Sequence, residues 1–323
     1  MMHPFMMIFY LTLLNLVVSF PSNVNTRICR SATWNRQGIT VAGGNGLGSG
    51  LNQLYSPNGI FISDDGSIYV SDTNNNRVVK WTIGQPNGQI VVGLNQQQKL
   101  GQITKAVVDR NGNIFVCDRD NNRVLKFTQV NSTGEIIVEN ISCWGLALDQ
   151  QDSLYVSDLN QNLVRKWPTN EIVAGGNGQG NAINQLSAPY QLFVDSNQTI
   201  FIADRGNNRV MKWNRDAKQG MMAFPSQGYG NADDQLYKPM GVTVDQMGTM
   251  YVVEYINLRV MRWFQTETQG HLIIGGQGYG IRPDQLYFPR DLAFDLQGNL
   301  YVADTNNHRI QMFTIDTTSC SNN

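Results

Sequence analysis

Short apolar runs separated by turn residues follow one another along most of the chain. In the first such set, strand-like segments cover residues 59–63, 67–71, 77–81 and 89–93. Each run is rich in β-branched and aromatic residues and is bounded by Gly, Asn or Asp, which is the pattern of short strands joined by turns. The set therefore predicts an antiparallel unit of four strands.

This unit is repeated along the chain. The phrase YVSDTNNNRVVKW at residues 69–81 recurs to give six copies, spaced 40 to 50 residues apart. The acidic positions of the copies are Asp72, Asp118, Asp158, Asp204, Glu254 and Asp304. Six four-stranded antiparallel blades predict an all-β, six-bladed β-propeller, a ring that leaves only short, protected strand edges.

The two ends of the repeat region complement each other. Residues 39–44 resemble a fourth strand without the three that should precede it, and the last copy has three strands but no fourth. We therefore expect the N-terminal strand to complete the sixth blade. Cys29 and Cys320 would then be neighbours, and a disulfide between them would lock the ring; two free or intermolecular thiols are the alternative.

The first residues differ from the repeats. Residues 5–20 are mostly apolar and end near a small-residue cleavage site at 17–19, which is typical of a secretory signal peptide; an uncleaved signal anchor is the alternative. We expect a secreted protein with no membrane span after cleavage, and nothing in the sequence indicates its oligomeric state. The predicted organisation is a signal peptide (1–19), a lead-in (20–38), the propeller (39–315) and a C-terminal tail (316–323).

Composition narrows the range of partners. The 24 Lys and Arg residues nearly balance the 25 Asp and Glu residues, so there is no electrostatic reason to expect a nucleic-acid partner. Four cysteines in a secreted chain favour disulfides, and the absence of a CxxC motif argues against a zinc ribbon. Sequons at Asn131, Asn140 and Asn197 are candidates for glycosylation.

The third copy departs most from the others. The link that precedes it is cut to residues 140–145, and Leu163 stands where Arg is expected, so Asp158 lacks its usual partner. Cys143 replaces the Pro that four of the other copies have, and Cys117 precedes the acidic position of the second copy. Both cysteines should lie at one face of adjacent blades. We expect a second disulfide, Cys117–Cys143; two buried thiols are the alternative.

The repeated acidic and Arg residues are interpreted as structural. Catalytic groups seldom recur once per blade, whereas Asp at a strand end can accept N–H bonds from the following turn. An Arg five residues later can reach back to that carboxylate through its planar guanidinium. The residues assigned this role are Asp72, Arg77, Asp118, Arg123, Asp204, Arg209, Arg259, Asp304 and Arg309.

Glycine-rich segments between the blades raise the question of a nucleotide site. Gly44, Gly46 and Gly48 crowd together as in a phosphate-binding loop, and similar segments recur later in the chain. A phosphate loop needs a helix N-terminus after it, whereas a strand follows each of these segments. They are interpreted as links from the fourth strand of one blade to the first strand of the next.

The repeated positions Pro57-x-Gly59, Asp72 and Asn75-x-Arg77 resemble the NHL-repeat family of β-propellers, and the resemblance covers residues 39–313. The resemblance implies the propeller fold. It does not specify the function, because this fold carries both ligand-binding scaffolds and several enzymes.

Function is therefore sought where the copies differ. The residues after each Pro position and after each acidic position should share one end of the ring with the interblade links, here called the loop face. Aromatic and Arg side chains there suit a binding surface, although variable loop residues without a function are the alternative. The candidate ligand-binding residues are Arg119, Trp144, Tyr190, Arg205, Tyr255 and Arg290. The favoured function is a secreted scaffold that binds a protein or glycan ligand, with no catalytic residue or resident metal assigned.

A metal-dependent enzyme is the main alternative. The chain also resembles the propeller of peptide-amidating lyases, which implies a zinc held by histidines with catalytic Arg and Tyr. Only His271 and His308 follow the signal segment, and the repeat pattern places them apart, so no histidine-rich zinc centre is expected. Arg205 and Tyr255 are the residues that would supply the Arg and the Tyr.

Two further functions remain open. In a lactonase-like hydrolase, calcium would be held by Asn58, Glu254 and Asp291, which makes Ca²⁺ the one cofactor considered. Cytosolic NHL modules bind RNA or partners beside a ubiquitin-ligase RING. The neutral charge, the signal segment and the lack of a Cys/His zinc module argue against that role here.

Overall fold

The computed structural model describes residues 28–93, 98–128, 131–224 and 228–320. The predicted signal peptide lies outside the described residues. Within them, no helix has the length and apolar character that a membrane span requires.

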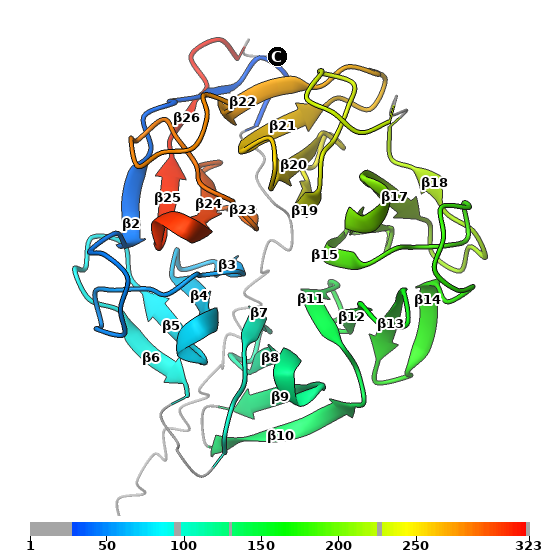
Figure 1. The fold of residues 1–323 in the computed structure, drawn as a ribbon, viewed down its shortest axis with the longest axis horizontal. Helices are drawn as coiled ribbons and strands as arrows, with labels where there is room; N and C mark the ends of the chain where they lie inside the picture. The colour runs from blue at the N-terminus through cyan, green and yellow to red at the C-terminus, as the bar shows by residue number, and fades with distance from the viewer. Residues whose placement is uncertain (1–27, 94–97, 129–130, 225–227, 321–323) are drawn as a thin grey trace, which may run out of the picture.

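Six antiparallel sheets of four strands each form a ring (Figure 1). Because each strand is followed by a turn and then by its partner, every blade is a meander whose first strand lies innermost, except that the fourth strand of blade 6 comes from the N-terminus. Blade 1 is β3 (Ile60–Ile62), β4 (Ile68–Asp72), β5 (Arg77–Trp81) and β6 (Gln89–Val92). Blade 2 is β7 (Ile103–Val108), β8 (Ile114–Asp118), β9 (Arg123–Thr128) and β10 (Asn131–Glu139). Blade 3 is β11 (Cys143–Leu148), β12 (Leu154–Asp158), β13 (Leu163–Trp167) and β14 (Glu171–Gly175).

The second half of the ring repeats the plan. Blade 4 is β15 (Pro189–Val194), β16 (Ile200–Asp204), β17 (Arg209–Trp213) and β18 (Met221–Met222). Blade 5 is β19 (Pro239–Val244), β20 (Met250–Glu254), β21 (Arg259–Trp263) and β22 (His271–Gly275). Blade 6 is β23 (Leu292–Phe294), β24 (Leu300–Asp304), β25 (Arg309–Phe313) and β2 (Ile39–Gly43).

The ring closes as predicted. Strand β2 pairs with β25, with Ile39 opposite Met312, so the N-terminal strand completes blade 6. The Cys29–Cys320 disulfide ties the two ends of the propeller together. A second pairing was not predicted: β1 (Thr33–Trp34) pairs with β26 (Ile315–Asp316), which adds a short ribbon outside the blade.

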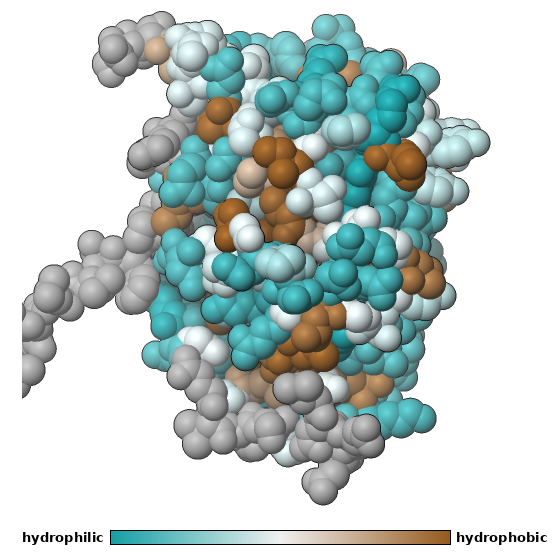
Figure 2. Space-filling view, turned by 90° about the vertical axis from the view of Figure 1, so that its left-hand side faces the viewer, coloured by the Kyte–Doolittle hydropathy of each residue, from teal (hydrophilic) through white to brown (hydrophobic). Residues whose placement is uncertain are grey.

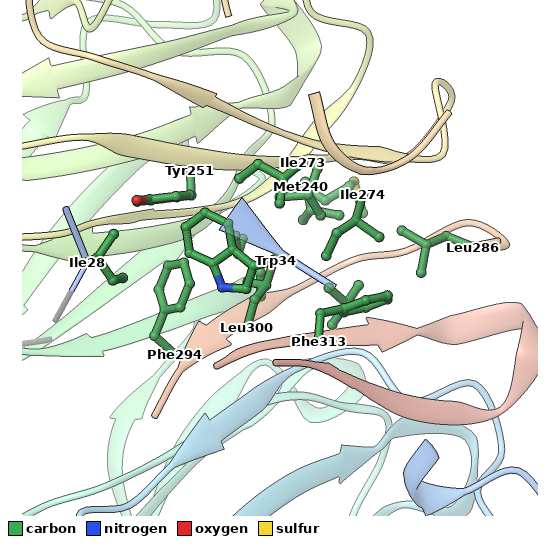
Figure 3. Close-up of a cluster of buried hydrophobic side chains, with 14 of the residues drawn as sticks. Ile28, Trp34, Met240, Tyr251, Ile273, Ile274, Leu286, Phe294, Leu300 and Phe313 are labelled. Atoms are coloured by element: carbon green, nitrogen blue, oxygen red, sulfur yellow. The ribbon is translucent and has the colours of Figure 1, made fainter. Parts of the chain in front are cut away.

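The lead-in also contributes to the core. Trp34 is buried between Tyr251 of blade 5 and Phe294 of blade 6, with ring centroids 5.8 and 5.9 Å away (Figure 3). Its indole N–H donates to the carbonyl oxygen of Gly298 at 2.9 Å, so the polar end of the ring is satisfied. The segment before the propeller therefore fills the junction between these two blades.

The other junctions are apolar contacts between neighbouring sheets. Trp81, Trp213 and Trp263 are almost fully buried at these junctions. The junction of blades 6 and 1, for example, joins Tyr301 and Ile310 to Trp81. On the outer wall, apolar residues form small separate groups among hydrophilic ones (Figure 2).

Four of the turns between second and third strands are single 3-10 turns: η1 (Thr73–Asn75), η2 (Arg119–Asn121), η3 (Arg205–Asn207) and η4 (Thr305–Asn307). Each ends on a left-handed residue; Asn208, for example, has φ 53°. Asn is favoured at such positions because its short polar side chain tolerates positive φ. These turns present their first residue, including Arg119 and Arg205, at the loop face.

The repeated carboxylates act differently from the prediction in one respect. Asp204 forms no side-chain hydrogen bond that caps its own turn. Its Oδ1 accepts instead from the N–H of Ser187, in the incoming interblade link, at 2.7 Å. The carboxylate points back to that link, where it meets an amide without a strand partner. Asp158 of blade 3 does cap its own turn, accepting from Asn160 and Gln161.

The predicted Arg partners are present. Arg209 Nε donates to Asp204 Oδ2 at 2.7 Å, and its Nη atoms donate to the carbonyl oxygens of Asn181, Ala182 and Gln185. Burial raises the pKa of the Asp204 carboxyl, while its hydrogen bonds and the guanidinium oppose that rise. The same pairing joins Asp72 to Arg77, Asp118 to Arg123, Glu254 to Arg259 and Asp304 to Arg309.

Candidate binding site at the loop face

A cavity of about 340 Å³ opens at the loop face. Its lining contains all six residues that the sequence predicted for ligand binding. The full lining is Ser56, Asn58, Thr73, Asn74, Gln102, Arg119, Trp144, Tyr190, Arg205, Met240, Tyr255 and Arg290. We call this set the mouth cavity. The residues come from every blade, so the cavity belongs to the ring as a whole.

Irregularities at the start of the inner strands turn these side chains inward. The pairing register shifts between Ile103 and Ala106 in blade 2 and between Cys143 and Leu146 in blade 3. Equivalent shifts occur after Pro189 in blade 4 and Pro239 in blade 5. Bulges re-aim side chains next to functional sites. Each shift falls at a position that lines, or lies next to, the mouth cavity.

Hydrogen bonds between blades fix the backbone of the two central aromatic residues. Thr104 Oγ donates to the carbonyl oxygen of Trp144 at 2.8 Å, and Ser157 Oγ donates to that of Tyr190 at 2.7 Å. The two rings lie against each other, with centroids 4.1 Å apart. The neighbouring blade therefore fixes the backbone at each of the two residues, and their rings pack against each other.

Three guanidinium groups lie over these rings. Arg119 lies 4.9 Å from the Trp144 centroid, and Arg205 lies 4.8 Å from that of Tyr190. The guanidinium of Arg290 lies 5.4 Å from the ring centroid of Tyr255 and 5.9 Å from that of Trp144. Such contacts attract a cation without neutralising it.

The positive charge of the mouth cavity has no counter-ion in its lining, which includes neither Asp nor Glu. Among the contacts of described residues, the Arg119 guanidinium donates only to the neutral amide oxygen of Gln102, at 3.2 Å. Nearby, burial and the charge of Arg205 lower the pKa of Lys238. The cavity is therefore a cationic site with hydrogen-bonding capacity to spare.

Several buried polar atoms point to an incomplete set of contacts. Within the described part of the chain, Nε of Arg205, Nε of Arg290, Nε1 of Trp144 and Oδ1 of Asn58 have no hydrogen-bond partner. An unpaired buried polar atom costs about 1–3 kcal/mol. These four atoms all belong to residues that line the mouth cavity.

Beneath the mouth cavity the residues alternate in size from blade to blade. Gly59, Gly145 and Gly241 alternate around the ring with Lys105, Gln191 and Asp291. A Cβ on Gly145 would lie 2.5 Å from the carbonyl oxygen of Tyr190 in the next blade, so only glycine fits there. Sequence reasoning missed this layer, although the alternation is visible two residues after each Pro position of the repeats.

The residues considered for calcium have different surroundings. Asn58 lines the mouth cavity, whereas Asp291 lies beneath it and pairs with Lys105. Glu254 is buried and accepts from Arg259, Asn257 and the N–H of Tyr237. Among the described residues no group of three or more His, Cys, Asp and Glu side chains is arranged to hold a metal.

The two histidines have separate partners, as the repeat pattern predicted. His271 is exposed and lies 2.6 Å from Glu267 on the outer side of blade 5. His308 Nδ1 accepts from the N–H of Ser56 at 3.1 Å, at the junction of blades 6 and 1. Arg205 and Tyr255, considered for a lyase, both line the mouth cavity.

The second predicted disulfide is present, so the cysteine predictions are confirmed. Cys117 and Cys143 join blade 2 to blade 3. Of the sequons, Asn140 and Asn197 are exposed. The side chain of Asn131 lies outside the described residues, and occupancy of the three sites stays a prediction.

Comparison with known proteins agrees with this architecture. The profile of the NHL repeat matches residues 54–81, 100–127 and 286–313, in blades 1, 2 and 6. No curated protein matches the chain by sequence.

Similar solved structures are remote in sequence. A Bacteroides thetaiotaomicron protein of unknown function has a TM-score of 0.68 at 16% identity, over 88% of this chain and 76% of its own. An auxiliary nutrient binding protein from Bacteroides ovatus has a TM-score of 0.63 at 13% identity, over 91% of this chain and 76% of its own. Virginiamycin B lyase from Staphylococcus aureus has a TM-score of 0.58 at 12% identity, over 88% of this chain and 99% of its own. At these identities the likeness concerns the fold. The repeat matches and the six four-stranded blades together show a six-bladed β-propeller that contains NHL repeats.

Proposed function

We propose that this propeller is an extracellular binding protein that holds its ligand in the mouth cavity and carries out no chemistry of its own. The observation that supports this most is the convergence of the variable positions. Arg119, Trp144, Tyr190, Arg205, Tyr255 and Arg290 all line one cavity at the end of the ring. Its volume is near the lower end of the range of small-ligand pockets, about 300–1,000 Å³.

Preorganisation supports the same role. Hydrogen bonds between blades hold the backbone of Trp144 and Tyr190, whose rings pack against each other, and guanidinium groups lie over the rings. A site that is already ordered loses little entropy when a ligand binds. The ligand would be a small molecule, or the end of a glycan or peptide that fits the cavity.

The extracellular location rests on the two disulfides and on the predicted signal peptide. Disulfides persist in oxidising compartments and are rare in the cytosol. One neighbour in fold is named as a nutrient binding protein, which accords with a binding role.

A cavity-filling variant tests the proposal. Met240→Trp would occupy the mouth cavity from blade 5, whereas Met247→Trp adds the same ring at an exposed turn of that blade, outside its lining. Both proteins and the wild type are applied to an array of immobilised glycans and extracellular peptides. We expect wild type and Met247→Trp to bind the same spots and Met240→Trp to lose them, while both variants keep the wild-type circular dichroism. Equal binding by all three proteins would place the ligand elsewhere.

A further inference from the structure

The three arginines of the mouth cavity follow the symmetry of the ring. Arg119 belongs to blade 2, Arg205 to blade 4 and Arg290 to blade 6. They therefore approach the axis from alternate blades. Arg119 and Arg290 both lie over the ring of Trp144, and Arg205 lies over Tyr190, which packs against Trp144. The three charges gather around one pair of aromatic rings.

Holding three cations together without an anion is unfavourable, because like charges repel most strongly where water is partly excluded. Many Asp and Glu residues lie elsewhere in the chain, and the repeated Arg residues of the blades, such as Arg77 and Arg209, are each paired with a carboxylate. The lining of the mouth cavity has none. The buried, unpartnered Nε atoms of Arg205 and Arg290 add donors that only an acceptor can satisfy.

The rest of the lining includes neutral polar side chains. Blade 1 contributes Ser56, Asn58, Thr73 and Asn74, and blade 2 contributes Gln102. Amide and hydroxyl groups of this kind both donate and accept, as the hydroxyl groups of a sugar require. The lining therefore combines cationic groups with neutral groups that suit hydroxyl groups.

We propose, building on the binding role above, that the mouth cavity recognises a tetrahedral oxyanion ester on a sugar, a sulfate or a phosphate. The ester group would enter along the axis, with one terminal oxygen toward each of Arg119, Arg205 and Arg290. Guanidinium groups bind such oxygens by strong charge-assisted hydrogen bonds. The sugar ring would then lie toward Asn58, Asn74 and Gln102.

Calorimetric titration of the purified protein tests this inference with four probes: glucose 6-sulfate, glucose 6-phosphate, glucuronate and glucose. We expect at least one of the two esters to bind ten or more times more tightly than glucose and more tightly than glucuronate, whose carboxylate offers only two oxygens. The preferred ester identifies the source of the oxyanion. Affinity should fall as the NaCl concentration rises, because the charges are partly solvated.

Single variants locate the binding. Arg119→Gln, Arg205→Gln and Arg290→Gln should each weaken ester binding about tenfold or more, whereas Arg215→Gln, at an exposed position outside the mouth-cavity lining, should not. Arg205→Lys keeps the charge and should retain more affinity than Arg205→Gln. Melting temperatures are recorded for every variant, and a variant that is not folded is replaced by its Lys counterpart.

Other results would overturn the inference without touching the binding role. Glucose binding as tightly as the esters would remove the need for an anion, and tightest binding of glucuronate would contradict the tetrahedral group. Suppose that the wild type binds neither ester and that Met240→Trp abolishes its array binding. The binding role would then stand, and the oxyanion proposal would be refuted. If array binding survives Met240→Trp and neither ester binds, both proposals fail.

Discussion

The Nζ of Lys105 lies 2.5 Å from Oδ2 of Asp291, and this ion pair links blade 2 to blade 6 across blade 1. Lys105 also donates to the carbonyl oxygen of Ile60 at 2.7 Å, and Asp291 accepts from the N–H of Ile60 at 2.9 Å. Both side chains are buried beneath the mouth cavity. The pair thus fastens three inner strands at the point where the N-terminal and C-terminal blades meet.

Removing one charge of this pair should be costly. Asp291→Asn leaves the Lys105 ammonium buried without a counter-charge, which typically costs about 3–5 kcal/mol of unfolding free energy. Replacing both residues, by Lys105→Met with Asp291→Leu, should recover most of that loss because no buried charge remains. Chemical denaturation measures both. The exposed pair of Arg110 with Asp152 provides the control, since Arg110→Met should change stability by about 1 kcal/mol or less. Equal losses at the two sites would contradict the proposed fastening.

The Asp–Arg pair of blade 4 makes a second prediction. Arg209→Ala would leave Asp204 and the carbonyl oxygens of Asn181, Ala182 and Gln185 without their donor. We expect a loss of about 3 kcal/mol of unfolding free energy, measured in urea. Arg215→Ala, at an exposed position with a weak partner, should cost less than about 0.5 kcal/mol. A melting curve like that of wild type would refute the structural role of the pair.

The sequence predicts the ring well because each blade repeats the same local signals. Turn residues at fixed offsets define the strands, and the unmatched pieces at 39–44 and at the last copy predict the closure that β2 and β25 form. The disulfides followed, since Cys143 stands at a Pro position and Cys117 beside an acidic one. Such features depend on order along the chain, which the sequence contains.

What the sequence could not supply depends on contacts between distant segments. Nothing near Trp34 indicates that its ring lies between Tyr251 and Phe294, because those residues belong to the last two blades. The direction of the Asp204 carboxylate, toward Ser187 rather than its own turn, depends likewise on how the link folds back. The six candidate residues could be found from their variability along the repeats. Which guanidinium lies over which ring could not be found in this way.

The two disulfides should differ in their effect on stability. In the chain-entropy model the stabilisation grows with the loop that is closed, to about 5.7 kcal/mol for Cys29–Cys320, which are 291 residues apart. The 26-residue separation of Cys117 and Cys143 corresponds to about 3.5 kcal/mol. Paired Cys→Ser variants, compared by urea denaturation, should therefore be destabilised in that order. The reverse order would indicate that closure depends on the β2–β25 pairing and the Trp34 contacts rather than on the covalent link.

The last prediction concerns His308, at the junction between blades 6 and 1. His308 Nδ1 accepts from Ser56 N–H, where Asn162 and Asn208 accept with Oδ1 from Ala188 and Lys238 at the corresponding junctions. Burial lowers the pKa of His308 from its ordinary value of 6.5, and the nearby Asp72 charge only partly opposes this; the ring of Tyr55 packs beside it.

A lowered pKa in the folded state means that the unfolded chain binds more protons, so this contribution to stability is lost as the pH falls below about 6.5. Protonation also replaces the acceptor with a donor that faces the Ser56 N–H. His308→Asn, which copies the other junctions, should therefore lose less unfolding free energy than wild type between pH 7.5 and pH 5.5. The buried carboxylates titrate in both proteins and cancel in the comparison. A parallel response of His308→Asn and wild type would mean that the imidazole does not titrate in the folded ring over this range.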